Sequence, residues 1–244
     1  MSTRGNAKMI AGLLLGTLLF LVIALTGPAL WQMLHPSPGG DGAAVATHDL
    51  PWQIETLPGG GTRVFGVRPG QDTIAQIAST WPTEAADMKV ALVRDPQGRL
   101  TLEAYLENVR AGFVQGRIVL TGQMAETTLR RWEAQASARE PQPSGSYRLT
   151  LQAEDAAAAR GATLVALAFL PAARIDEATA VERFGAPTER LGAPDGTVNL
   201  LYPARGLAIS LDPQGRGKPV LQYVAPADFA RLRAPLLPPG RAAP

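Results

Sequence analysis

The sequence contains no cysteine and only two histidines, His35 and His48, and these absences exclude several kinds of chemistry. Without cysteine, the chain has no disulfide, no thiol that could carry a lipoprotein's lipid, no thiolate nucleophile and no thiolate zinc ligand. Both histidines lie in a stretch rich in Gly and Pro, where no fixed geometry is expected, so no Ser-His-Asp triad or histidine metal site is predicted. We therefore predict no enzyme activity, no metal and no cofactor.

Carboxylate pairs are the remaining route to catalysis, because two acids suffice for reactions such as glycoside hydrolysis. The candidates are Glu103 with Glu107, and Glu154 with Asp155. Carboxylates at solvent-facing positions of strands are more often structural than catalytic, so a non-catalytic role is favoured.

Lysine is scarce, at 3 residues against 20 arginines, and the chain beyond residue 31 has no excess of either charge. Only Arg4 and Lys8 precede that point, so 21 basic residues stand against 21 acidic residues after it. A nucleic-acid-binding protein needs a basic surface that displaces counterions from phosphates, so no nucleic-acid partner is predicted. The preference for Arg, with abundant Ala, Gly and Pro, indicates a GC-rich genome, and anion recognition by guanidinium groups is the alternative reading.

One apolar run, Met9–Trp31, has no charged residue in 23 positions. As a helix that rises about 1.5 Å per residue, it can cross a hydrocarbon core of about 30 Å. Arg4 and Lys8 precede it and the next charge is Asp41, so the positive-inside rule places residues 1–8 in the cytoplasm. The sequence predicts a single-pass inner-membrane protein of a Gram-negative bacterium, with its domain in the periplasm.

A cleavable secretory signal is the alternative for this run, with a small-x-small cleavage site at Ala44-Val45-Ala46. Both readings export the rest of the chain. Residues 32–48 are rich in Gly, Pro and Ala, which predicts a flexible linker. Gly12 and Gly16 form a small-xxx-small pair that can bring two helices together, so self-association is a further hypothesis and the oligomeric state stays open.

The chain after the linker mixes strand and helix patterns, which predicts an α+β fold with an antiparallel sheet or sheets and two or three helices packed on one face. Residues 99–109 alternate strictly, with Leu102 and Ala104 on one face and Glu103 and Tyr105 on the other, so one face is expected in the core and one in water. Thr163–Leu170 is continuously apolar and predicts a strand buried on both faces. Further strands are predicted at 88–94, 113–121, 146–153, 197–202, 206–211 and 218–226, and helices at 72–81, 123–140 and 176–184.

A Pro- and Ser-rich stretch at 140–146 predicts a boundary between two α+β units, 49–140 and 146–233, followed by a loose tail at 234–244. Each unit contains an Asp-Pro-Gln-Gly-Arg turn, at residues 95–99 and 212–216. The order of helix, proline and strand before each turn is similar, although the spacing differs. Duplication of one unit is one reading, and chance recurrence of a sequence that favours turns is the other.

The helix predicted at 123–140 carries the candidate partner-binding residues Arg130, Arg131 and Trp132. In one reading this helix presents the three side chains to a partner protein. In the other, Trp132 anchors the helix in the core while its charged neighbours lie in solvent.

Residues 183–215, RFGAPTERLGAPDGTVNLLYPARGLAISLDPQG, resemble the helix-plus-meander modules of SmpA/OmlA-type envelope assembly lipoproteins and of β-lactamase-inhibitor-like repeats. The resemblance implies helices on an antiparallel sheet and a role in protein–protein contact in the bacterial envelope. We therefore predict a non-catalytic binding or assembly domain whose sheet face or sheet edge meets an envelope partner at the same membrane. The alternative is a binding protein for a small ligand or cell-wall fragment, with a cleft between the two units.

Overall fold

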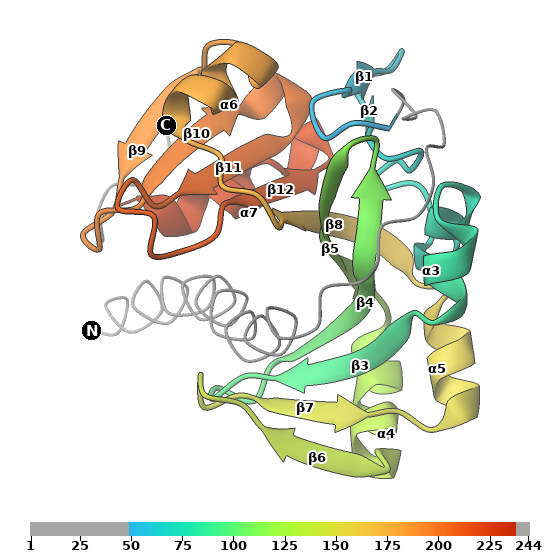
Figure 1. The fold of residues 1–244 in the computed structure, drawn as a ribbon. Helices are drawn as coiled ribbons and strands as arrows, with labels where there is room; N and C mark the ends of the chain where they lie inside the picture. The colour runs from blue at the N-terminus through green and yellow to red at the C-terminus, as the bar shows by residue number, and fades with distance from the viewer. Residues whose placement is uncertain (1–48, 238–244) are drawn as a thin grey trace, which may run out of the picture.

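The computed structural model describes residues 49–237, which form an α+β fold around one ten-stranded antiparallel sheet (Figure 1). The predicted transmembrane helix Met9–Trp31, the linker 32–48 and residues 238–244 lie outside the described residues. Between residues 49 and 237, no helix combines the length and the hydropathy needed to cross a bilayer. A separate two-stranded pair, β1 (Glu55–Thr56) and β2 (Thr62–Arg63), lies near the start of this part of the chain.

In the large sheet, every neighbouring pair of strands is antiparallel. In Figure 1 its two ends, at β6 and β9, lie at the bottom and the top of the view, with β5 and β8 between them. Across the sheet the strands are β6 (Ala138–Pro141), β7 (Tyr147–Thr150), β3 (Lys89–Arg94), β4 (Leu100–Ala111), β5 (Val114–Gln123), β8 (Thr163–Pro171), β12 (Val220–Val224), β11 (Leu207–Leu211), β10 (Val198–Tyr202) and β9 (Glu189–Gly192).

The helices are short. The α-helices are α3 (Pro82–Ala86), α4 (Glu126–Gln135), α5 (Ala153–Ala159), α6 (Glu177–Phe184) and α7 (Ala230–Arg233), and the 3₁₀ helices are η1 (Ile74–Ser79), η2 (Pro203–Arg205), η3 (Pro226–Asp228) and η4 (Ala234–Leu236). The helix predicted at 72–81 is the 3₁₀ helix η1, and Pro82 starts α3 instead of ending a helix, because the first helical position needs no backbone N–H donor.

Helix α6 agrees with its prediction. The Asp176 side chain accepts a hydrogen bond from the backbone N–H of Thr179 at 2.7 Å and so caps the N-terminus. Gly185, with φ of 79°, ends the helix in a conformation that favours glycine. Helix α4 ends at Gln135, earlier than predicted, because residues 138–141 form an edge strand.

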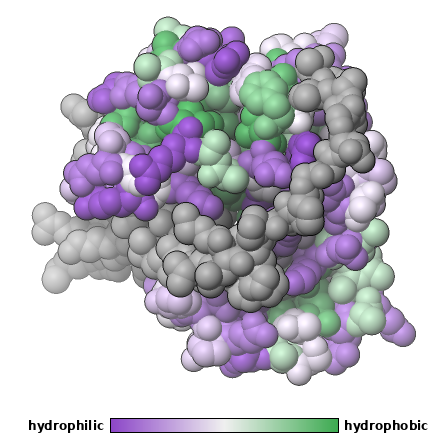
Figure 2. Space-filling model, viewed as in Figure 1, coloured by the Kyte–Doolittle hydropathy of each residue, from purple (hydrophilic) through white to green (hydrophobic). Residues whose placement is uncertain are grey.

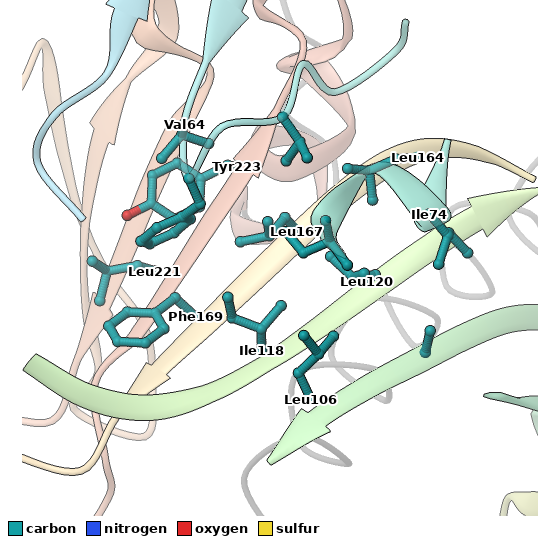
Figure 3. Packing of buried hydrophobic residues seen from close by; sticks show 14 of the residues in the cluster. Val64, Ile74, Leu106, Ile118, Leu120, Leu164, Leu167, Phe169, Leu221 and Tyr223 are labelled. Atoms are coloured by element: carbon teal, nitrogen blue, oxygen red, sulfur yellow. The ribbon is translucent and has the colours of Figure 1, made fainter. Parts of the chain in front are cut away.

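The main core lies on the face of the sheet that carries η1 and α3 to α6, here called the first face. Alternate residues of the central strands point into it, including Ile118 of β5, Phe169 of β8 and Tyr223 of β12 (Figure 3). Gly116 of β5 leaves room for the Phe169 ring, since a Cβ atom there would lie 2.5 Å from Cε2 of that ring. The Tyr223 hydroxyl donates a hydrogen bond to the Pro51 carbonyl at 2.9 Å, which fixes the beginning of the described chain on the core.

The stretch 140–146, predicted as a boundary, forms the turn of the β6–β7 hairpin within the continuous sheet. The two halves instead match about the β5–β8 pair, because each has one hairpin next to the centre, β3–β4 or β11–β12, and one hairpin at the edge, β6–β7 or β9–β10. Counted from the centre to either edge, β5, β4, β3, β7 and β6 correspond to β8, β12, β11, β10 and β9.

The two Asp-Pro-Gln-Gly-Arg turns occupy corresponding places, between β3 and β4 and between β11 and β12. In each turn the aspartate side chain, Asp95 or Asp212, accepts hydrogen bonds from backbone N–H groups two and four residues later. Helices α4 and α6 also correspond, because each follows a central strand and precedes an edge hairpin. The helix that corresponds to α6 is therefore α4, and not the one predicted at 72–81.

Candidate interaction surface

The opposite face of the sheet, here called the second face, has an apolar centre made by side chains of adjacent strands. Val119 of β5, Ala168 and Leu170 of β8, and Val220 of β12 form a cluster of their own, with Tyr105 of β4 packed against it. These side chains are buried, with Tyr105 half-buried, but no helix among residues 49–237 contributes to the cluster. A buried apolar cluster to which no helix of the described residues contributes is a candidate contact surface for a helix.

At one end of the second face, the chain does place a helix. Phe229 and Leu232, at the start of and within α7, pack on Leu201, Ala208 and Val224 of strands β10, β11 and β12. This face of the sheet therefore accepts a helix directly beside the apolar centre.

A polar cluster borders the apolar centre on the β4 side. The Tyr105 hydroxyl donates a hydrogen bond to the Glu103 carboxylate, and the Arg148 guanidinium lies 5.0 Å from the centre of the Tyr105 ring. Glu103 is only 4% exposed, and this burial raises the pKa of its carboxyl group. Burial, with the nearby Glu103 charge, raises the pKa of Tyr105 well above its usual value. Nε of Arg148 is buried without a hydrogen-bond partner among the described residues.

A second polar pair lies on the other side of the apolar centre. The Ser210 hydroxyl of β11 donates to the side-chain oxygen of Asn199 of β10 at 2.7 Å, and both residues are buried. This bond pairs the Ser210 hydroxyl with the side-chain carbonyl oxygen of Asn199 inside the chain.

The two edges of the sheet are less suited to adding a strand from a partner. All four residues of β6 are exposed, and they include Arg139, Glu140 and Pro141. The opposite edge, β9, carries Glu189 and Arg190, which form ion pairs with side chains of this chain. Charged residues and proline at an edge disfavour the pairing of a further strand, so the face is the better candidate surface.

The three residues predicted to bind a partner differ in burial: Trp132 is buried, whereas Arg130 and Arg131 are exposed. Trp132 is 1% exposed and packs in the core of the first face, and its Nε1 has no hydrogen-bond partner among the described residues. Its burial excludes direct contact with a partner of the folded domain. Arg130 and Arg131 are exposed, and Arg130 forms ion pairs with Glu126 at 2.8 Å and with Glu133 at 3.1 Å. A partner-binding role for the two arginines stays a prediction.

The two carboxylates of the first candidate pair, Glu103 and Glu107, lie in different environments. Glu103 is buried and bonded to Tyr105, whereas Glu107 is exposed and pairs with Arg117 at 2.5 Å. The expectation that Glu103 lies on a wet face is therefore wrong, because Tyr105 and Arg148 pack beside it on the second face. Residues 154 and 155 are in the first turn of α5, where acidic side chains favour the helix dipole. Within residues 49–237, no three Asp, Glu or His side chains gather in a way that could hold a metal ion.

A cavity of ≈ 570 Å³ lies within the second half of the sheet, between the start of α6 and the β11–β12 turn. Its walls include the apolar residues Val198 and Leu211 and the charged residues Arg174 and Asp212. The Arg174 guanidinium lies against Gly215, where a Cβ atom would come within 2.7 Å of Nη1. This cavity is formed by one half of the sheet, and not by a cleft between the two halves.

No protein-family model, no curated protein and no solved structure matches this chain. The resemblance to envelope helix-plus-meander modules stays a prediction that rests on the turns of residues 183–215.

Only one feature of the sequence indicates the second-face cluster. The continuous apolar run 163–170 predicts a strand buried on both faces, and β8 is such a strand, with Leu167 and Phe169 in the main core and Ala168 and Leu170 in the second-face cluster. The neighbouring strands gave no such signal, because their second-face residues are small, polar or isolated.

Proposed function

We propose that this protein is a single-span inner-membrane protein whose periplasmic domain is a non-catalytic binding or assembly module. Its segment Met9–Trp31 would anchor it in the membrane with the N-terminus in the cytoplasm. The observation that carries the binding role is the apolar cluster on the second face, to which no helix of residues 49–237 contributes.

The partner that fits this face is an apolar helix of another envelope protein held at the same membrane. The centre of the cluster carries only aliphatic side chains, so it has no charge or hydrogen-bonding group to match. Helix α7 shows how a helix packs on the adjoining part of the face, through Phe229 and Leu232. The Glu103 carboxylate and the Ser210 hydroxyl are already paired within the chain, and their clusters limit the apolar area on its two sides.

Site-specific photo-crosslinking tests this proposal. p-Benzoylphenylalanine replaces Val119 at the centre of the cluster, and the matched control replaces Glu154, an exposed residue of α5. Irradiation of cells that express the full chain should give an adduct at position 119 and none at 154, and peptide mapping should place the adduct in an apolar helix of another membrane protein. Equal adducts at both positions, no adduct, or an adduct with residues 9–31 of the same chain would each reject it.

A reporter fusion tests the placement in the membrane separately. A periplasm-specific reporter joined after Pro244 should be active, and a cytosol-specific reporter at the same place should be silent. The reverse result would reject the proposed orientation and compartment.

A second candidate function is the binding of a small ligand or cell-wall fragment, and the cavity of ≈ 570 Å³ favours it. Arg174 supplies a cation at its wall and Asp176, Glu177 and Asp212 supply carboxylates, while Val198 and Leu211 supply apolar surface, so the lining suits a ligand with both charged and apolar groups. A ligand that binds the native state raises the melting temperature. In a screen of muropeptides and other cell-wall fragments, at least one ligand should therefore raise the melting temperature of the wild type but not of Arg174→Ala. A screen without any such rise rejects this candidate.

We also propose that the two halves of the sheet derive from one duplicated unit. The matching hairpins of the two halves and the corresponding places of the two Asp-Pro-Gln-Gly-Arg turns support this.

A further inference from the structure

An exposed aromatic group lies at the point where the domain begins. Of the described residues, only Phe113 and Tyr147 are large hydrophobic residues with exposed side chains, at 60% and 40%. Phe113 lies in the turn between β4 and β5, and its ring centre is 5.7 Å from that of Trp52. The Arg183 guanidinium, near the end of α6, lies 5.2 Å from the centre of the Trp52 ring. These three residues, Trp52, Phe113 and Arg183, are here called the aromatic tip.

The position of the aromatic tip is fixed by the core. Trp52 also packs edge-on against Phe184, at 6.3 Å between ring centres, and Phe184 is buried. The preceding residue, Pro51, accepts the hydrogen bond of the buried Tyr223 hydroxyl. The tip is therefore a rigid part of the domain, and Phe113 is exposed because it projects beyond this support.

The aromatic tip is also close to the predicted anchor along the chain. Trp52 follows the predicted linker, residues 32–48, by only a few positions. A Gly-rich linker of 17 residues has an end-to-end distance of about 20–25 Å. An anchored molecule would thus hold this part of the domain near the bilayer surface. In Figure 2, hydrophobic surface interrupts the hydrophilic surface in the upper part of the molecule, where Figure 1 shows α6 and the β4–β5 turn.

The chemistry of the tip suits the membrane–water interface. Trp side chains are favoured at the level of the lipid headgroups, because the ring is apolar and its N–H is polar. An arginine beside them can reach lipid phosphates while its stem lies along apolar surface. Phe113 adds an apolar ring for the boundary with the acyl chains.

We propose that the aromatic tip inserts into the headgroup region of the lipid bilayer and fixes the orientation of the domain on the membrane. This inference rests on the proposed membrane anchoring. The tether brings the tip to the bilayer, and the local concentration it creates makes a weak contact effective.

The absence of cysteine from the chain permits a direct test. Gln115→Cys places a single thiol two residues from Phe113 at an exposed position, where it is labelled with the dye NBD. The full chain is reconstituted at one molecule per nanodisc with lipids that carry a doxyl quencher at the upper acyl chain. The matched control is NBD on Tyr147→Cys, the other exposed aromatic position.

The expected result is quenching of NBD at position 115, loss of that quenching when Phe113→Ala is added, and no quenching at position 147. No quenching at 115, or equal quenching at 115 and 147, overturns the inference. Quenching that persists in Phe113→Ala also overturns it, because Phe113 would then not hold the tip in the lipid. Extraction of membranes with alkaline carbonate tests the anchor independently: a chain that stays in the membrane without quenching leaves the proposed function standing and rejects only the aromatic tip.

Discussion

Replacing Trp132 by alanine separates its role as a core anchor from a role in binding a partner. Its side chain is 1% exposed and joins α4 to the sheet. A buried Trp removes about 150–250 Å² from water, which at about 25 cal/mol per Å² corresponds to roughly 4–6 kcal/mol. Its buried N–H has no hydrogen-bond partner among the described residues, and this offsets about 1–3 kcal/mol of that gain.

We therefore expect Trp132→Ala to lower the free energy of unfolding by about 3 kcal/mol, within the range known for such truncations. In a domain of this size, that change lowers the melting temperature by about 6–12 °C. Trp132→Phe keeps most of the apolar contact and removes the unpaired N–H, so it should stay within about 1 kcal/mol of the wild type.

Urea unfolding of the full chain in mild detergent, followed by far-UV circular dichroism, measures these differences. Arg131→Ala is the matched control, because the side chain is exposed on the same helix and should change stability by less than about 0.5 kcal/mol. A change of less than 0.5 kcal/mol for Trp132→Ala would refute the placement of this residue in the core.

Three further predictions concern buried groups and a turn. The native pKa of Glu103 is raised by burial, so its contribution to stability is complete below the unfolded pKa and is lost as the pH rises through the native pKa. In thermal melts over a pH series, the melting temperature of Glu103→Gln should therefore decline less steeply with rising pH than that of the wild type. Gly206→Ala should cost at least about 2 kcal/mol in urea unfolding, because its φ is +62° and a Cβ would lie 2.0 Å from the Val224 carbonyl oxygen. Tyr223→Phe should cost about 1–2 kcal/mol in the same assay, because the Pro51 carbonyl loses its buried donor.

Each of these has its own control or contrary result. Gly192→Ala is the control for Gly206, since it has no neighbour within 4 Å and no positive φ, and it should be neutral. Equal losses for the two glycine variants would contradict the steric argument. Parallel pH curves for the wild type and Glu103→Gln would show that Glu103 takes up no proton on folding. An unchanged midpoint in Tyr223→Phe would contradict the value assigned to its hydrogen bond.

The strands with strong alternation could be predicted from the sequence, and those that depend on neighbours could not. Strand β4 follows from the alternation around Leu102 and Ala104, because half-buried strands repeat every two residues. The edge strands β6 and β9 are polar and short, and they form because β7 and β10 offer hydrogen-bonding partners. Helix α5 was missed although its alanines favour a helix, because no apolar periodicity marks it.

The candidate surfaces were less predictable than the strands. The sequence left two roles open for Trp132, core anchor or partner contact, and its burial in the structure supports the role of core anchor. The second-face cluster gathers one residue from β5, two from β8 and one from β12, and whether they meet depends on the register of the sheet. The aromatic tip joins Trp52 and Phe113, which are 61 positions apart in the sequence, a contact that no local pattern encodes.

The match between the two halves also means that they are circular permutations of one arrangement. In the second half β10 continues through η2 into β11, whereas the corresponding strands β7 and β3 are paired without a direct link, Thr150 facing Ala91. Conversely, β4 continues into β5 through the turn at Gly112, whereas β12 and β8 are paired but unlinked. The same neighbours are reached from two different starting points along the chain. The order of strands in this sheet is therefore specified by which strands pair with each other, and not by their order along the chain. Its turns are suitable places at which new chain ends can be engineered.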